Sequence, residues 1–161
     1  MTLAESPIVA SHVVRGVTRL LRRGDVACLA EVPLGCNRRA DIMGIDAAGR
    51  ITIVEIKVSL ADLRGDRKWP EYLGYCDRFF WAVPAGFDLA PFAQAQLAPQ
   101  ITGLIIADRF DAEEVRPAPW HPTGTPMSAP RRKAETLAFA RRAAARMMAI
   151  ADPEAAALLR D

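Results

Sequence analysis

The sequence has few of the residues that disulfide frameworks and zinc sites require. Its three cysteines, Cys28, Cys36 and Cys76, show no CxxC spacing, and its only histidines are His12 and His121. Neither histidine has a serine or cysteine partner in a recognisable motif, which argues against a catalytic triad. Cysteines without a pairing pattern are typical of a reducing compartment, so we expect the protein to be cytoplasmic.

Segments for membrane insertion, export and nucleotide binding are also missing. No apolar run reaches the roughly 18 residues of a membrane span, and the stretch MTLAESPIVASHVVRG has no basic region followed by an apolar core. Neither GxxxxGK[ST] nor GxGxxG occurs, so the common phosphate-binding loops are not indicated. We therefore expect no membrane partner.

The remaining composition is that of a globular protein with a locally uneven charge. The chain has 161 residues, 51% of them hydrophobic and 25% charged, and we expect one domain over residues 1–161. The net charge is only +2, but basic residues cluster between 15 and 23 and between 131 and 146. Such clusters suit a polyanion, and a solvated helix face has the same pattern.

Helical and strand patterns alternate along the chain. Apolar spacing after Ser6-Pro7 predicts a helix that ends at Gly24. Five prolines between 116 and 130 predict an extended connector that is packed on the surface and is not a domain boundary. This order predicts an α/β sandwich with a mixed central sheet. The remaining predicted elements are strands over 26–34, 39–46, 50–58, 78–83 and 102–108, a further edge strand over 113–119, a loop over 59–65 followed by a short helix over 66–77, a short helix or loop over 91–100, and a long helix over 131–150.

The hairpin over residues 39–58 brings acidic residues together. Asp46 and Gly49 occupy the first and fourth positions of a turn, which favours a three-residue loop with glycine in the left-handed region. Counting outward from that loop places Asp41 directly opposite Glu55 on one face of the sheet. Lys57 lies two residues beyond Glu55 and shares the same face.

Two carboxylates this close repel unless a positive group lies between them. Magnesium or manganese accepts such oxygen ligands and keeps positions open for water and phosphate. Lys57 suits a phosphate or an attacking water, so the three residues fit phosphodiester hydrolysis. An alternative stays open, in which Asp41 and Glu55 form a structural cluster with Lys57, or with Arg38 and Arg39.

The hairpin resembles a known nuclease signature. Asp41, followed after 13 residues by Glu55-Ile56-Lys57, resembles the PD-(D/E)XK motif, with Ala40 where the superfamily has proline. The segments RRADIM, IVEIKVSLADLRGDRKWPEYLGYCDRFFWAVP, GLIIAD and RRKAETLAFARRAAARM together resemble the MmcB family of bacterial DNA repair proteins, a branch of this superfamily. The resemblance spans about residues 8–148. It implies a restriction-endonuclease-like three-layer sandwich, a mixed central sheet flanked by helices.

The resemblance also implies roles for individual residues. It makes Asp41 and Glu55 ligands of Mg²⁺ or Mn²⁺, adds the backbone carbonyl of Ile56, and gives Lys57 the task of orienting water or stabilising negative charge. Many members have a further acidic metal ligand, and Glu31 is the candidate for that ligand here. The alternative is that Glu31 simply lies on the polar face of an edge strand. DNA is the implied partner, other repair proteins could join it, and the protein would associate with the nucleoid when acting.

Two further segments are candidates for DNA contact. In RGDRKWPEYLGYCDR we assign Trp69 and one tyrosine to the core and Lys68 to DNA. One side of the last helix is basic. Phe139 and Ile150 interrupt that side, and we expect them to contact another element or a second copy of the chain in a homodimer. We expect the other side, with Leu137, Ala140, Ala144 and Met148, to be packed. The nucleic-acid-binding candidates are Arg38, Arg39, Lys68, Arg131, Arg132, Arg142 and Arg146.

These patterns support two functions of different classes. The first is a metal-dependent DNA endonuclease acting in repair, because Asp41, Glu55 and Lys57 are all present. The second is a catalytically silent module of the same fold that binds nucleic acid or recruits proteins. A nuclease acting on RNA fits the same residues.

Overall fold

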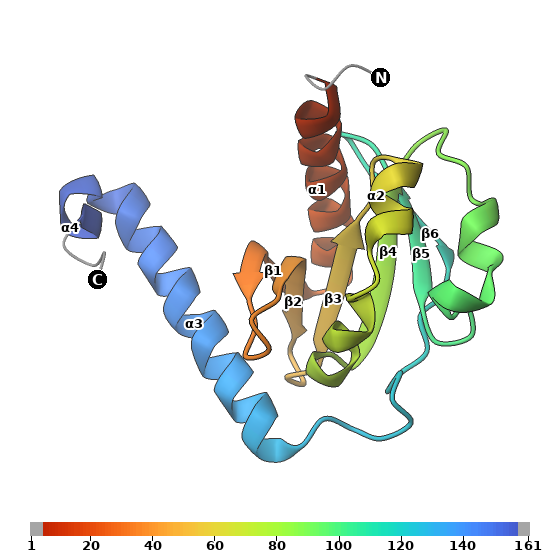
Figure 1. Cartoon of the computed structure of the whole chain (residues 1–161). Helices are drawn as coiled ribbons and strands as arrows, with labels where there is room; N and C mark the ends of the chain where they lie inside the picture. The colour runs from red at the N-terminus through yellow and green to blue at the C-terminus, as the bar shows by residue number, and fades with distance from the viewer. Residues whose placement is uncertain (1–4, 158–161) are drawn as a thin grey trace. The chain divides into compact units, whose positions relative to one another are not determined.

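The structure is a computed structural model that describes residues 5–157, with side chains from residue 9 onward. A six-stranded sheet follows chain order, with strands β1 (Val26–Pro33), β2 (Arg39–Asp46), β3 (Ile51–Ile56), β4 (Arg78–Pro84), β5 (Gly103–Ala107) and β6 (Ala112–Arg116) (Figure 1). The β1–β2, β2–β3 and β5–β6 pairs are antiparallel, whereas β3–β4 and β4–β5 are parallel. The mixed sheet that the sequence predicts is therefore confirmed.

The chain divides into two compact units, Met1–Met127 and Ser128–Asp161. The first contains the whole sheet. The second contains α3 (Ala129–Ala151) and α4 (Pro153–Ala157), which contact each other. A single domain over residues 1–161 stays a prediction. In the described residues no helix combines the length and the apolar character that crossing a bilayer requires.

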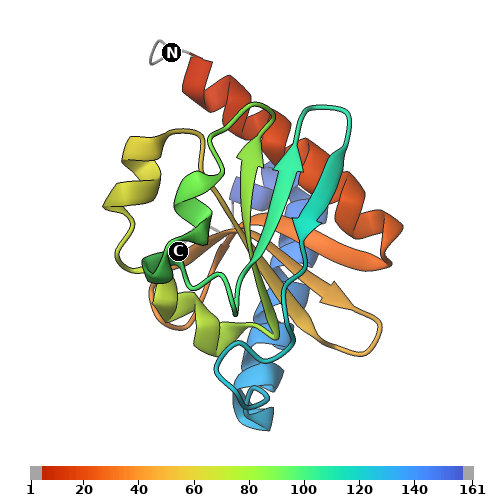
Figure 2. The ribbon, with the colours of Figure 1, turned by 90° about the vertical axis from the view of Figure 1, so that its right-hand side faces the viewer.

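One face of the sheet is covered by α1 (Glu5–Arg23) (Figure 2). Its fully buried Val13 and Val17 join a core cluster with Ile42, Val54 and Phe80 from the strands. A helical spacing of four residues places both valines on one side of α1, which is why the sequence pattern predicts this packing. The burial removes apolar surface from water and holds the helix against the strands.

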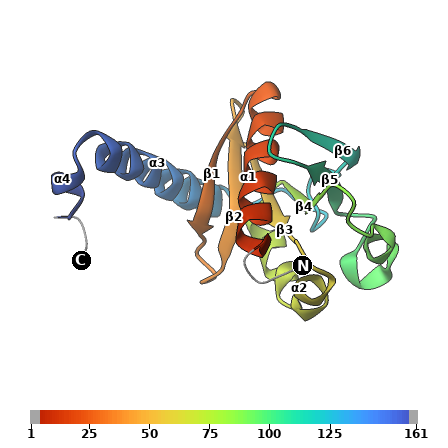
Figure 3. The same cartoon turned by 90° about the horizontal axis from the view of Figure 1, so that it is seen from above.

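The close approach of α1 to the sheet depends on a small residue. A Cβ atom at Gly16 would collide with the carbonyl oxygens of Asp108 and Asp111 in the β5–β6 turn. Figure 3 shows α1 running alongside the sheet. Any larger side chain at this position would push the helix away from the turn.

The opposite face of the sheet is covered by α2 (Leu60–Gly65) and by short 3₁₀ helices over Trp69–Tyr75, Ala90–Ala93 and Ala95–Leu97. Trp69 packs on Phe79 and Trp81 of β4, with ring centroids 5.5 and 5.3 Å apart. Offset and edge-on aromatic pairs of this kind add to the stabilisation that burial provides. With α1 on the other face, the predicted three-layer α/β sandwich is confirmed.

The proline-rich connector lies on the surface of the first unit, as predicted. Trp120 stacks with the guanidinium groups of Arg50 and Arg78, which lie 4.2 and 4.3 Å from its ring centroid. The backbone N–H of His121 donates to the Asp77 carbonyl at 2.8 Å. Contrary to the prediction that this segment is no domain boundary, the division between the two compact units falls inside it, after Met127.

One prediction about the helices is wrong. Residues 60–65 form α2 and not a loop, because a helix of six residues shows no apolar periodicity to read; Ser59 caps it by accepting the Asp62 N–H at 3.1 Å. Packing of one side of α3 on another element stays a prediction. Within the described part of the second unit, where α4 is the other helix, that side is exposed. Its exposed residues are Leu137, Ala140, Ala144 and Met148.

Candidate active site

The β2–β3 turn has the predicted geometry. Gly49 adopts a φ of 76°, and its N–H donates to the Asp46 carbonyl at 2.9 Å. The Asp46 carboxylate accepts the N–H groups of Ala48 and Arg50, each at 2.9 Å. The ladder then pairs Ile45 with Ile51 and continues in the same register toward the site. This register places Asp41 opposite Glu55, so the turn count from the sequence is confirmed.

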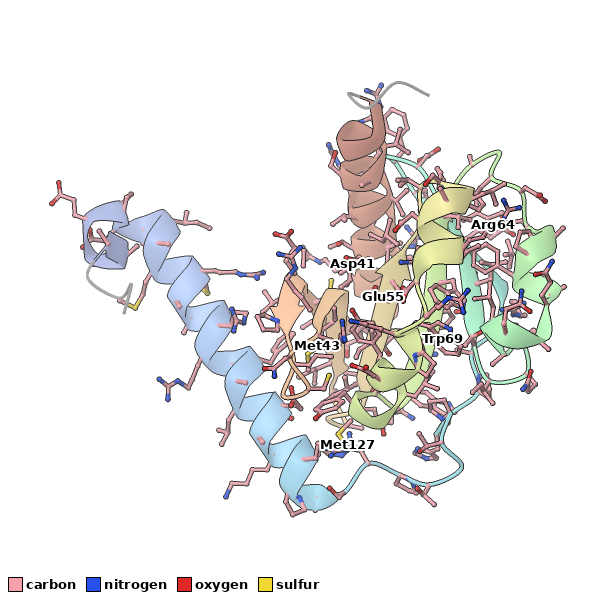
Figure 4. All side chains as sticks on the ribbon, in the orientation of Figure 1. Asp41, Met43, Glu55, Arg64, Trp69 and Met127 are labelled. Atoms are coloured by element: carbon pink, nitrogen blue, oxygen red, sulfur yellow. The ribbon has the colours of Figure 1, made fainter. Side chains whose placement is uncertain are left out.

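At the end of this ladder, carboxylates replace the backbone acceptors. Beyond the Ile42–Val54 pair, the Asp41 N–H donates to Glu55 Oε1 at 3.0 Å. The Ile56 N–H donates in turn to Asp41 Oδ2 at 2.7 Å. Each strand thus holds the carboxylate of its neighbour in a fixed position. Figure 4 labels both acids on these adjacent strands.

The site disfavours two negative charges. Glu55 is only 4% exposed, and burial together with the nearby Asp41 charge raises its pKa to about 8. Burial also raises the pKa of Asp41, although the hydrogen bond from Ile56 and the charge of Lys57 oppose this. At neutral pH the pair therefore favours holding a proton or a cation.

Lys57 is buried beside these acids but pairs with others. Its Nζ lies 2.8 Å from Asp66 Oδ2 and 3.8 Å from Asp62 Oδ1. Burial lowers the pKa of Lys57, but the hydrogen bond and charge of Asp66 outweigh that effect and raise it. Lys57 is thus charged at neutral pH, and it contributes to the electrostatic surroundings of Asp41 and Glu55.

The predicted structural alternative required ion pairs that do not form among the described residues. Arg38 pairs with Glu71 at 2.6 Å, and Arg39 pairs with Glu31 at 3.6 Å. In this part of the chain neither arginine, nor Lys57, forms an ion pair with Asp41 or Glu55. The two carboxylates therefore approach each other without a paired cation of their own.

Sequence reasoning missed Asp62 and Asp66. The segment Ser59-Leu60-Ala61-Asp62 has the spacing of a capping box, which signals a helix start but not the direction in which the helix runs. The Asp66 carboxylate also accepts the N–H groups of Lys68 and Trp69 at 3.2 and 3.0 Å. These bonds fix Asp66, and through it they hold the ammonium group of Lys57.

A pocket of about 450 Å³ opens at Asp41, and Glu31, Asp62 and the α1 residue Ser11 also line it. Glu31 has a φ of 52°, and its side chain is 69% exposed beside Arg39. In the described residues no group of three or more His, Cys, Asp or Glu side chains is placed to hold a metal ion. Glu31 as a metal ligand therefore stays a prediction.

The donor set nevertheless fits a hard divalent cation. Each carboxylate uses one oxygen for a strand N–H. Among the described residues, Asp41 Oδ1 and Glu55 Oε2 accept no hydrogen bond. Two free carboxylate oxygens, with water and substrate oxygens, match the coordination that Mg²⁺ prefers.

The other predicted DNA-binding residues are distributed over both units. Lys68 is exposed, while Trp69 and Tyr72 are buried, so the core assignment of one tryptophan and one tyrosine is confirmed. The Tyr72 hydroxyl donates to the Arg39 carbonyl at 3.0 Å. The basic residues of the second unit lie on α3: Arg131 is exposed, and Arg132, Arg142 and Arg146 are half-buried.

Comparison with known proteins gives one family and one solved structure. A family model described as DNA repair protein MmcB-like matches residues 4–154. The solved structure is SPO1766, a protein of unknown function from Silicibacter pomeroyi; it is 41% identical and has a TM-score of 0.76. The match covers 90% of this chain and 92% of that one. No curated protein matches.

Proposed function

The chain belongs to the MmcB-like family of DNA repair proteins, and we propose that it is a metal-dependent deoxyribonuclease that hydrolyses phosphodiester bonds. The observation that carries this proposal is the reciprocal bonding of Asp41 and Glu55. It holds two carboxylates side by side, each with one free oxygen. A purely structural acid pair would gain more from a cationic side chain between the two groups than from a second acid.

Asp41, Glu55 and the Ile56 carbonyl would hold Mg²⁺ or Mn²⁺. Such an ion, when bound, polarises a phosphate oxygen and lowers the pKa of a water molecule. Glu55 would lose its proton on binding, because its pKa of about 8 keeps it protonated at neutral pH in the free protein. This coupling makes cation affinity increase with pH.

Lys57 would act as the electrostatic catalyst. Its ammonium has three N–H donors, and Asp66 occupies one of them at 2.8 Å. A remaining donor could orient water or bind a phosphoryl oxygen as negative charge develops. Asp66 would then act as a positioning residue, since it reaches the reaction only through Lys57.

One observation favours the second function, a catalytically silent module that binds nucleic acid or recruits proteins. Lys57 is already paired with Asp66 and Asp62, and a protonated Glu55 would remove the repulsion between the two acids of the pair without any metal ion. Intact residues do not require turnover. This function predicts DNA binding that is indifferent to divalent metal.

Cleavage of a defined panel separates the two functions. Labelled single-stranded, nicked, forked and duplex DNA, with single-stranded RNA, would be incubated with Mg²⁺, Mn²⁺ or EDTA. We expect cleavage of DNA with metal and none with EDTA or with Asp41→Asn. Glu113→Gln, which changes an exposed acid on β6, should cleave like wild type. DNA binding without cleavage of any substrate would support the silent module.

A further inference from the structure

A second pocket, of about 650 Å³, is lined in part by Asp66, the ion-pair partner of Lys57. The segment from α2 to Pro70 lines one side, and residues 91–97 line the other. Arg64 and Trp69, labelled in Figure 4, belong to the first side. The volume is within the range of sites that bind small molecules and cofactors, about 300–1,000 Å³.

The lining combines an apolar base with amide groups. Leu63, Trp69 and Leu97 contribute side chains that are at most 5% exposed. Gln94 and Gln96 lie at the rim and are exposed. A flat nucleobase has apolar faces and a polar edge with donors and acceptors, so this combination suits one unpaired base.

The mouth of the pocket carries positive charge that is not neutralised internally. Arg64 and Arg67 are exposed, and neither forms an ion pair within residues 5–157. Arg38 and Arg39, by contrast, are paired with Glu71 and Glu31. Free guanidinium groups beside a pocket that can hold a base suit phosphates of a nucleic-acid strand.

Asp66 connects this pocket to the candidate active site. It lines the pocket, and the same carboxylate bonds Lys57 at 2.8 Å. Its charge is satisfied by Lys57 and by two backbone N–H groups, so it does not cancel the arginines at the mouth. A nucleotide in the pocket would lie next to the phosphate that Lys57 contacts.

We propose that the pocket binds one unpaired base of a DNA strand, with Arg64 and Arg67 on the adjoining phosphates. This inference rests on the proposed function, because it treats the pocket as the subsite beside the scissile phosphate. A paired, stacked base cannot enter such a pocket. The substrate class is therefore single-stranded or locally unpaired DNA.

Fluorescence anisotropy in EDTA tests this site without turnover. The probes are a 12-nucleotide single strand, the same sequence as a duplex, and a 12-residue abasic strand with equal phosphate charge. We expect the abasic strand and the duplex to bind at least about tenfold more weakly than the normal strand, as the loss of one stacked base implies. Equal binding of the normal and abasic strands would overturn the proposal.

Variants locate the effect in the pocket. Arg64→Ala with Arg67→Ala should weaken single-strand binding about tenfold, and Gln94→Glu should abolish the preference for the normal over the abasic strand. Arg109→Ala, at an exposed arginine in the β5–β6 turn, should change affinity less than about twofold. If the pocket variants match this control, the pocket does not bind DNA.

A parallel cleavage assay with Mn²⁺ separates the two proposals. Base-dependent binding without cleavage would keep the pocket and contradict the nuclease. Cleavage without base-dependent binding would keep the nuclease and contradict the pocket.

Discussion

Asp41 and Glu55 stabilise each other's strand. The Glu55 carboxylate accepts the Asp41 N–H at 3.0 Å, and the Asp41 carboxylate accepts the N–H of Ile56, next to Glu55, at 2.7 Å. A strand pair that ended in an ordinary ladder would leave both carboxylates free to separate. This bonding keeps two acids together in a buried place, where like charges repel. Protonation, cation binding and folding stability are therefore linked at this pair.

The stability of the metal-free protein should depend on pH through Glu55. Its pKa is raised from 4.5 to about 8, so between these values the folded state binds more protons than the unfolded state. Stability present below pH 4.5 is therefore lost as the pH rises through about 8. We expect wild type to lose roughly 1–4 kcal/mol of unfolding free energy, relative to Glu55→Gln, between pH 5 and 9. Urea melts in EDTA measure this, and parallel curves for the two proteins would contradict the burial argument.

Removing Lys57 should separate stability from activity. Lys57→Met leaves the Asp66 carboxylate without its cation, and we expect a loss of about 1–3 kcal/mol in unfolding free energy. Adding Asp66→Asn removes the stranded charge and should restore part of that stability. Cleavage should fall by about 100-fold or more in both variants, because the developing charge loses its donor. Lys57→Met with full cleavage activity would show that Lys57 is structural.

DNA binding should depend on salt through α3. Each phosphate contact contributes about 0.9 to the log–log salt slope on duplex DNA. Replacing Arg142 and Arg146 by alanine should therefore lower the slope by up to about 2, while Arg109→Ala leaves it unchanged. Titrations between 50 and 200 mM salt, roughly the range in which the dependence is steep, measure this. The same slope and affinity in the double variant would mean that the basic side of α3 does not contact DNA.

Local sequence predicts the placement of Asp41 opposite Glu55, because a single turn determines it. The Asp46–Gly49 turn sets the register, and the register places Asp41 opposite Glu55. Strand pairing has a period of two, so a correct turn determines the face of every following side chain. This is why the pattern of residues alone assigns two acids 14 positions apart to one site.

The ion-pair partners of Lys57 and the burial of the apolar residues of α3 depend on tertiary structure. Asp62 and Asp66 meet Lys57 because α2 folds back over the end of β3, and no periodic pattern in six residues signals that reversal. The apolar residues of α3 have helical spacing, but spacing does not say whether another element covers them. Leu137, for example, has helical spacing and is 55% exposed among the described residues.

The most direct test of the central claim, that Asp41 and Glu55 form a metal-binding pair, is a set of urea melts of wild type and Glu55→Gln with and without Mn²⁺. Without metal, Glu55→Gln keeps the shape and the acceptor for the Asp41 N–H and removes the free-energy cost of protonating Glu55 or leaving it charged beside Asp41, so its stability should equal or exceed that of wild type. Saturating Mn²⁺ at about 100 times the Kd should stabilise wild type by about 2.7 kcal/mol and the variant by far less. Glu113→Gln serves as the control and should respond to Mn²⁺ like wild type. Destabilisation of Glu55→Gln by about 3 kcal/mol or more, with no stabilisation of wild type by Mn²⁺, would contradict the account and identify the acids as a structural cluster.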